Sequence, residues 1–144
     1  MYFISACLIG LNCKYNGGNN FNQKIFDLVK KGEAIFVCPE QLGGLNTPRV
    51  PSEIKSIDGK RCAISKDGRD VTKEYEKGAL ETLRLMKKLG VNKAILKSNS
   101  PSCGCGIIYD GTFTGTKIKG NGITTQILLD NGIEVITEQE LKEM

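Results

Sequence analysis

The chain has 144 residues, which suits one domain with its own hydrophobic core; 40% are hydrophobic and 25% charged, the balance of a soluble globular protein. No apolar run approaches the roughly 18 residues of a membrane-spanning helix, and a formal net charge of +4 is too small to indicate a nucleic-acid-binding protein. The first residues, MYFISAC, have neither the basic region nor the long apolar stretch of a secretion signal. We therefore expect a single domain, residues 1–144, in the cytoplasm and without membrane contact.

The predicted elements alternate between short apolar strands and helices. The first strand covers residues 2–6, and after a loop rich in glycine and asparagine a helix covers residues 20–31, capped by Asn20 and ended by Gly32. The second strand covers residues 34–37. Further along the chain we expect, in order, a helix at 72–89, a strand at 91–96, a helix at 123–130, a strand at 133–136 and a helical turn at 138–143.

The segments between these elements carry turn signals. Residues 38–51 are rich in proline and glycine and predict an ordered loop. Two small hairpins are expected, at 54–66 with a turn at Asp58-Gly59 and at 106–115 with a turn at Asp110-Gly111. The alternation of strands and helices predicts a single α/β domain, with a mainly parallel four-stranded sheet flanked by helices. Both hairpins would then lie near the carboxyl edge of the sheet and form walls of a site there.

Three cysteines follow three of the predicted strands. Cys7 and Cys38 come directly after the first and second strands, and Cys103 lies in the turn after the third. The carboxyl ends of parallel strands meet at one edge, which is where open α/β folds bind ligands. The chain has no histidine, and three thiolates without an imidazole suit an iron–sulfur cluster best. Three protein ligands to a four-iron cluster would leave one iron open to act as a Lewis acid.

Other uses of the six cysteines stay open at this point. A zinc site could use the same three cysteines together with Cys105, and an even number of cysteines also allows disulfides. Cys13 lies in the first loop, which we expect to be flexible, and it could be a fourth ligand or a resolving thiol. Cys62 falls within the first hairpin and is expected to be a packing residue.

Without histidine, proton transfer near neutral pH falls to a carboxylate, lysine, cysteine or tyrosine. Glu40 is two residues from Cys38 and is the candidate catalytic base; alternatively it is a loop carboxylate paired with Arg49. Arg49 and Lys97 are candidate substrate-binding cations. The turn before Cys103 also carries three alternating hydroxyl groups that could contact a substrate or a cluster, or could simply stabilise the turn, namely Ser98, Ser100 and Ser102.

Several motifs, taken together, resemble the thiouracil desulfidase family. They are Ser5–Gly10 (SACLIG), Cys13–Gly17 (CKYNG), Cys38–Glu40 (CPE), Gly43–Leu45 (GGL), Pro48-Arg49, Pro51, Ser100–Gly104 (SPSCG) and Gly120–Thr125 (GNGITT). The resemblance implies a [4Fe-4S] cluster held by Cys7, Cys38 and Cys103, with one iron that no protein residue ligates. That iron would take the sulfur of a thiolated pyrimidine base.

The reaction that the resemblance implies is a hydrolysis without net redox change, in which the base gains oxygen and sulfide is released. Glu40, Ser100 and Ser102 would then be catalytic, and Arg49, Lys97 and Ser98 would bind the substrate. The partner is a small thiolated base, and nucleic acid is not expected because the chain has no arginine-rich run and only 6% aromatic residues. Two rival functions are a zinc-stabilised binding domain and an iron–sulfur protein of sulfur transfer or tRNA thiolation.

Overall fold

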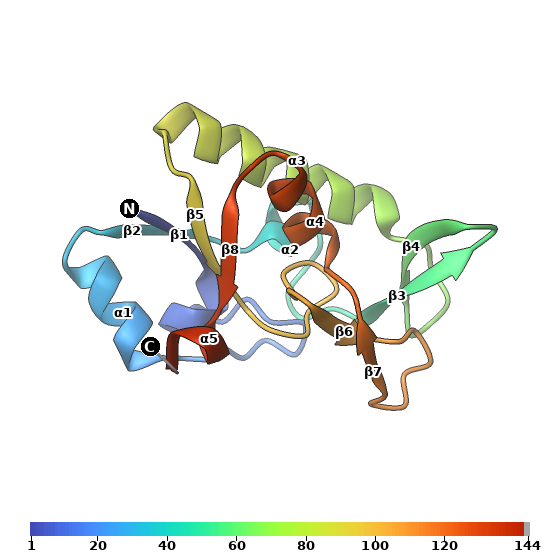
Figure 1. Cartoon of the computed structure of the whole chain (residues 1–144). Helices are drawn as coiled ribbons and strands as arrows, with labels where there is room; N and C mark the ends of the chain where they lie inside the picture. The colour runs from blue at the N-terminus through green and yellow to red at the C-terminus, as the bar shows by residue number, and fades with distance from the viewer. Residues whose placement is uncertain (143–144) are drawn as a thin grey trace.

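The computed structural model describes residues 1–142, and its centre is a parallel sheet of four strands. The strand order is β2 (Ala34–Val37), β1 (Tyr2–Ser5), β5 (Lys93–Leu96) and β8 (Glu134–Thr137) (Figure 1). The predicted α/β fold with a mainly parallel four-stranded sheet is therefore confirmed. Within residues 1–142, no helix combines the length and the apolar character that a membrane crossing requires.

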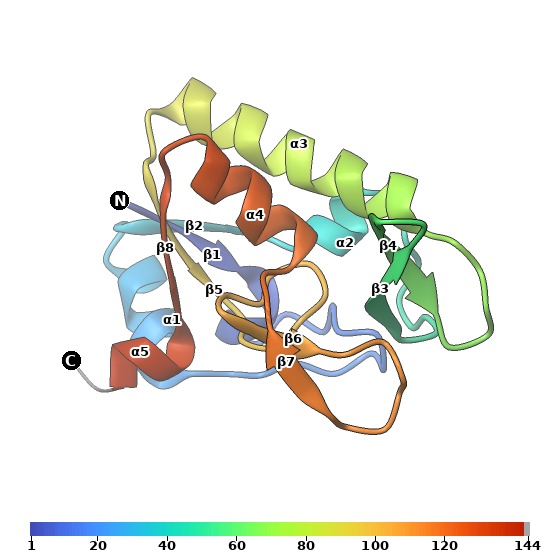
Figure 2. The ribbon, with the colours of Figure 1, turned by 45° about the vertical axis from the view of Figure 1, so that its right-hand side comes forward.

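Helices cover both faces of this sheet, as Figures 1 and 2 show. Alternate residues of β1 explain the arrangement, because successive side chains of a strand point to opposite faces. Phe3 packs in one apolar cluster with residues of α3 (Thr72–Leu89) and α4 (Ile123–Asp130). Ile4 packs in another with residues of α1 (Gln23–Lys30), and α5 (Glu138–Lys142) adds Leu141 there. Residue 143, predicted to extend the last helix, lies outside the described residues.

Two antiparallel hairpins lie beyond the parallel sheet. β3 (Ser52–Ile57) pairs with β4 (Lys60–Ser65) around Asp58 and Gly59, which both have positive φ, as a tight hairpin turn requires. β6 (Ile107–Tyr109) pairs with β7 (Lys117–Lys119). The second hairpin therefore turns through a loop of residues 110–116, longer than the predicted turn at Asp110-Gly111, and its second strand lies beyond the predicted end at residue 115.

Two further differences from the sequence prediction lie close to the cysteines. Asn22, not Asn20, caps α1, because its side chain accepts a hydrogen bond from the Ile25 amide at 3.2 Å. The loop predicted after Cys38 instead begins with a short helix, α2 (Pro39–Leu42). Proline is well tolerated in the first turn of a helix, where an amide hydrogen would have no partner. A 3₁₀ turn, η1 (Ala6–Ile9), directly follows β1.

The short helix α2 crosses α3 at a point where both backbones carry glycine. A Cβ atom added to Gly43 would lie 1.9 Å from the Glu74 carbonyl oxygen, and one added to Gly78 would lie 1.8 Å from the Pro39 carbonyl oxygen. No larger residue fits either position without moving one helix. This close approach sets the position of the residues on α2 relative to those on α3.

Candidate active site

A cavity of about 480 Å³ lies at the carboxyl edge of the parallel sheet. Eight of the nine site residues predicted from the sequence line it, namely Cys7, Cys38, Glu40, Arg49, Lys97, Ser98, Ser100 and Cys103. The ninth, Ser102, does not line it. Both hairpin regions contribute to the wall, through Ser52, Glu53 and Lys66 near the first and Tyr109, Phe113 and Gly115 in the second.

The three predicted ligand cysteines come from the ends of three adjacent strands. Cys7 lies in η1, Cys38 directly follows β2, and Cys103 lies in the turn after β5. The Ser5 hydroxyl donates a hydrogen bond to the Cys103 sulfur at 3.3 Å, and the Asn20 amide donates one to the Cys7 sulfur at 3.5 Å. Neither donor was anticipated from the sequence, where Asn20 was taken for a helix cap.

Cys13 lies beside Cys7 and Cys38 and is only 1% exposed, which corrects its prediction as part of a flexible loop. A hydrogen bond from its thiol lowers the pKa of Cys38 to about 7, with help from the Gln41 backbone and against the effect of burial. The same thiol is the largest cause that lowers the pKa of Cys7. These two bonds raise the pKa of Cys13 itself, because ionisation would remove the shared proton.

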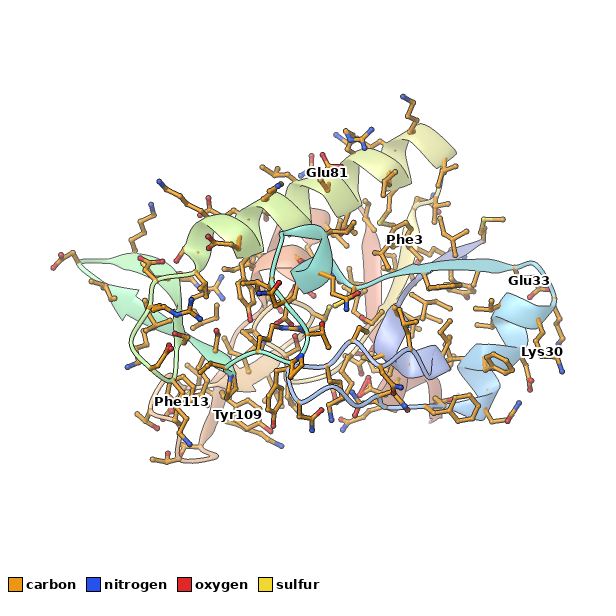
Figure 3. The ribbon with its side chains drawn as sticks, turned by 180° about the vertical axis from the view of Figure 1, so that it is seen from behind. Phe3, Lys30, Glu33, Glu81, Tyr109 and Phe113 are labelled. Carbon is orange, nitrogen blue, oxygen red and sulfur yellow. The ribbon has the colours of Figure 1, made fainter. Side chains whose placement is uncertain are left out.

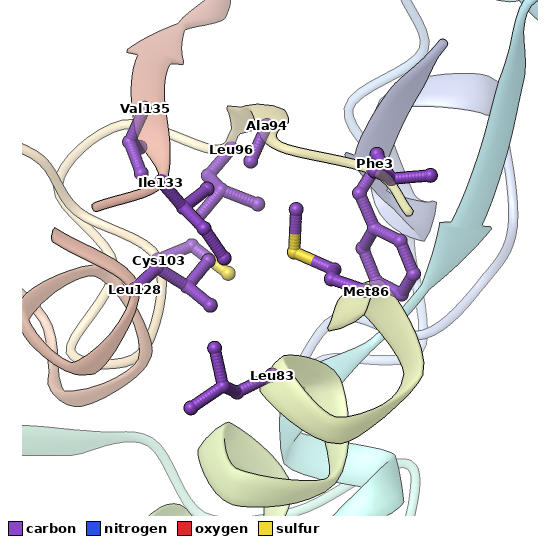
Figure 4. Packing of buried hydrophobic residues seen from close by; sticks show 10 residues of the cluster. Phe3, Leu83, Met86, Ala94, Leu96, Cys103, Leu128, Ile133 and Val135 are labelled. Carbon is purple, nitrogen blue, oxygen red and sulfur yellow. The ribbon is translucent and has the colours of Figure 1, made fainter. Parts of the chain in front are cut away.

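Whereas Cys7 belongs to the apolar cluster that includes α1, the Cys103 sulfur lies in the cluster that includes α3 and α4. Figure 4 shows it beside Leu128 and Leu96 in the cluster that covers one face of the sheet. Burial raises the pKa of this thiol, and the hydrogen bond from Ser5 opposes the rise only in part. A bound metal would supply the positive charge that such a thiol needs to ionise.

The donor chemistry of this wall fits an iron–sulfur cluster. Four cysteines line the cavity, and two of the proposed ligands receive hydrogen bonds from neutral side chains, which are common around cluster sulfurs. Within residues 1–142, no three cysteine or acidic side chains converge on a point where a single metal ion could bind. A four-iron cluster does not require the thiolates to converge on one point, because each thiolate binds a different iron atom.

The zinc site that would add Cys105 is not assembled in the structure. The Cys105 thiol faces the Val135 carbonyl oxygen at 3.9 Å and is not among the residues that line the cavity. All six cysteines, which fall within the described part of the chain, are free thiols. Cys62 is buried in the first hairpin, in keeping with a packing role.

Glu40 lies in the first turn of α2 and is held by two donors. Its Oε1 atom accepts hydrogen bonds from the Tyr75 hydroxyl at 2.8 Å and from the Arg49 Nε atom at 3.2 Å. The predicted pairing of Glu40 with Arg49 is therefore confirmed, and the Glu40 side chain, 16% exposed, also lines the cavity, whereas that of Arg49 is 8% exposed. Burial, and next the charge of Glu40, raise the pKa of Tyr75, so its hydroxyl keeps the proton that it donates.

Lys97 also lines the cavity. Its ammonium donates to the carbonyl and hydroxyl oxygens of Ser98, each at 3.1 Å, and lies 3.5 Å from the Glu138 carboxylate. The Ser98 hydroxyl in turn donates to Glu138. Ser98 is thus engaged within the protein, while Lys97 keeps a partly exposed ammonium at the cavity.

Ser100 and Ser102, equivalent in the sequence pattern, have different surroundings. The Ser100 oxygen accepts the backbone amides of Ser102 and Cys103, each at 3.0 Å, so its hydroxyl hydrogen can point to the cavity that it lines. Ser102 is 1% exposed, and its hydroxyl shares a hydrogen bond with Thr124 at 2.8 Å. Its carbonyl oxygen also accepts the amides of Thr124 and Thr125, which attaches the turn to the start of α4.

The chain is similar to known proteins in sequence and in structure. The chain is 43% identical over 150 residues to a Bacillus subtilis (strain 168) protein named Uncharacterized protein YbbK, and the match covers 100% of this chain and 99% of the relative. It also matches the solved structure of a [4Fe-4S]-dependent thiouracil desulfidase, TudS, with a TM-score of 0.90 and 40% identity, over 99% of this chain and 93% of that one. The sequence profile of the 2-thiouracil desulfurase family matches residues 3–140. The chain therefore belongs to the 2-thiouracil desulfurase family.

Proposed function

We propose that this protein is a [4Fe-4S]-dependent desulfidase that hydrolyses the carbon–sulfur bond of a thiouracil-like base and releases sulfide. One observation carries the proposal: three cysteines from three separate strand ends line the same cavity as an anchored glutamate. The family of the chain and the name of its structural match support the same chemistry.

Cys7, Cys38 and Cys103 would hold the cluster, and Cys13 would support two of them through its thiol. When bound, the cluster supplies an iron atom with an open position, a soft Lewis acid suited to a thiocarbonyl sulfur. The hydrogen bonds from Ser5 and Asn20 would hold the sulfur atoms of Cys103 and Cys7 in position to bind the cluster.

Glu40 is the proposed base that takes a proton from the attacking water. Both donors to its carboxylate bind Oε1, so Oε2 is the atom available to a water in the cavity. Tyr75 and Arg49 fix the orientation of the carboxylate, and Arg49 is itself anchored because it donates to the Cys13 carbonyl oxygen at 2.9 Å. The water oxygen then bonds to the thiocarbonyl carbon.

The remaining polar groups would bind the base and balance its charge. The Ser100 hydroxyl can donate to a heteroatom of the ring, and the Lys97 ammonium can stabilise negative charge that develops as water adds. The carbon–sulfur bond breaks, one water supplies the new carbonyl oxygen and two protons, and the products are the oxo-base and hydrogen sulfide. No electrons are gained or lost overall. We leave Ser102 out of this machinery because its hydroxyl is buried against Thr124.

The deciding experiment is anaerobic reconstitution of the full chain, followed by measurement of iron, sulfide and turnover of 2-thiouracil. We expect about four irons per chain, and equal amounts of uracil and free sulfide. Glu40→Gln should keep the iron content and lower turnover by about 100- to 10,000-fold, since it removes the base. Glu76→Gln, at an exposed position of α3, is the matched control and should behave as wild type.

Each result bears on a different part of the proposal. Formation of uracil without free sulfide would indicate that the sulfur is transferred to an acceptor and that the reaction is not a hydrolysis. Wild-type activity in Glu40→Gln would remove Glu40 as the base and leave the cluster assignment intact. A colourless protein that binds one zinc ion would contradict the proposal as a whole.

A further inference from the structure

One wall of the cavity is aromatic and comes from the second hairpin. Tyr109 ends β6, and Phe113 lies in the loop of residues 110–116; both line the cavity that the cysteines line. They lie at the same end of the molecule in Figure 3. Neither residue has a role in the water-activating step described above, so their presence in the cavity wall needs a separate explanation.

The backbone of Phe113 has an unusual conformation. Its φ angle is 58°, in the left-handed region, which a bulky side chain rarely adopts and which costs free energy. Such a conformation persists only where surrounding contacts impose it. It therefore indicates that the ring is placed at the cavity at the expense of backbone strain.

The contacts that impose this conformation come from β3. The buried carboxylate of Glu53 accepts hydrogen bonds from two amides of the loop, Gly111 at 2.9 Å and Phe113 at 3.1 Å. Gly111 also packs directly on β3, since a Cβ there would lie 2.8 Å from the Ile54 carbonyl oxygen. The Lys55 ammonium lies 5.8 Å from the centre of the Phe113 ring. The loop is thus held against the first hairpin at Gly111 and at Phe113 itself.

A fixed ring matters because the proposed substrate is flat. Coordination through sulfur fixes one atom of the base and leaves its plane free to turn. An aromatic wall restricts that rotation and favours planar heteroaromatic rings over other thiocarbonyl compounds. Stacking of this kind contributes substantially to base binding in proteins, and it is indifferent to the substituents on the ring edge.

We propose that Phe113 is a specificity-determining residue that stacks on the thiolated base, and that Glu53 is the positioning residue that holds it in place. This inference rests on the proposed function of the same cavity. It assigns the two hairpins a joint role, since β3 supplies the carboxylate and the β6–β7 loop supplies the ring.

The test measures the inhibition constant of uracil, the product, on the reconstituted enzyme. Uracil has no sulfur, so its affinity reports contacts of the ring rather than the bond to iron. Phe113→Leu should raise this constant and the KM for 2-thiouracil about tenfold or more, and should change kcat by less than about threefold. Phe113→Tyr keeps an aromatic ring and should retain wild-type binding.

Two further variants separate stacking from a general structural defect. Glu53→Ala should weaken uracil binding in the same direction as Phe113→Leu, because the ring loses its support. Phe26→Leu, on α1 and away from the cavity, is the matched control and should bind uracil as wild type. Iron content and thermal unfolding confirm that the compared proteins are folded and equally loaded.

An unchanged uracil constant in Phe113→Leu overturns the proposed stacking, and an unchanged constant in Glu53→Ala overturns the positioning role. If Phe113→Leu fails to fold, Glu53→Ala still decides, because it removes the support of the ring and leaves Phe113 unchanged. Failure of the proposed function can be told apart from failure of this inference. If the proposed function is wrong, the wild-type protein releases no sulfide from 2-thiouracil. Calorimetric titration with uracil would still show whether uracil binding depends on Phe113.

Discussion

The two sides of the cavity are built in different ways. The sheet side takes its groups from strand ends and from α2, which is packed against α3 through paired glycines. The hairpin side takes its groups from the two hairpins and from the seven-residue β6–β7 loop, which Glu53 holds in place. Groups that hold a metal and activate water need fixed geometry, which strand ends provide. Loops change shape and sequence more readily, so they suit the selection of a substrate.

The largest effect should come from the sheet side. Cys103→Ser removes one of the three proposed ligands, and we expect reconstituted iron to fall well below four atoms per chain, with loss of turnover. Iron and acid-labile sulfide analysis measures this directly. Cys62→Ser, a buried cysteine of the first hairpin, is the control and should load normally. Full loading of Cys103→Ser would show that the ligands were wrongly assigned.

The next effect should come from the crossing of α2 and α3. Gly78→Ala places a methyl group 1.8 Å from the Pro39 carbonyl oxygen, so α2 must move and carry Glu40 with it. We expect a loss of about 1–3 kcal/mol in the free energy of unfolding, together with a fall in kcat. Denaturant unfolding and turnover measure the two effects. Normal kcat in a destabilised variant would show that Glu40 tolerates displacement of its helix.

A smaller effect is expected from Tyr75→Phe, which removes one of the two donors to Glu40 and little volume. Loss of a hydrogen bond to a charged group of this kind should lower kcat about tenfold and leave the KM near its wild-type value. The comparison with Phe113→Leu is informative, since that variant should change the KM instead. Equal changes in the KM and kcat for both variants would remove the distinction between the two sides.

The smallest effect concerns the thiols of the metal-free protein. Because hydrogen bonding from Cys13 lowers the pKa of Cys38 to about 7, alkylation of Cys38 by iodoacetamide should rise with pH and be half-maximal near that value. Cys103, whose pKa is raised by burial, should stay unmodified over the same range. Cys13→Ala should shift the Cys38 profile to higher pH, as followed by peptide mass spectrometry. An identical profile in that variant would contradict the role given to Cys13.

The strands, the longest helix and the edge where the cysteines gather could be predicted because each depends on local pattern. Tyr75 could not be recognised, since it fits the apolar period of α3 and meets Glu40 only through the glycine contact. Ser100 and Ser102 look alike in the sequence, and only the docking of the turn on α4 separates them. Phe113 carries no sequence signal of its own, because its place depends on a carboxylate 60 residues away.

Cys103 belongs to the apolar core, so its proposed role as a cluster ligand would link cluster insertion to the stability of the fold. A ligand that binds only the native state raises the free energy of unfolding in proportion to the logarithm of its concentration over its dissociation constant. The proposed attachment point, Cys103, is a core residue whose turn also anchors the start of α4. Insertion of the cluster should therefore stabilise the layer of the domain that contains α4. Amide hydrogen exchange in α4 should be slower in the cluster-loaded protein than in the cluster-free protein.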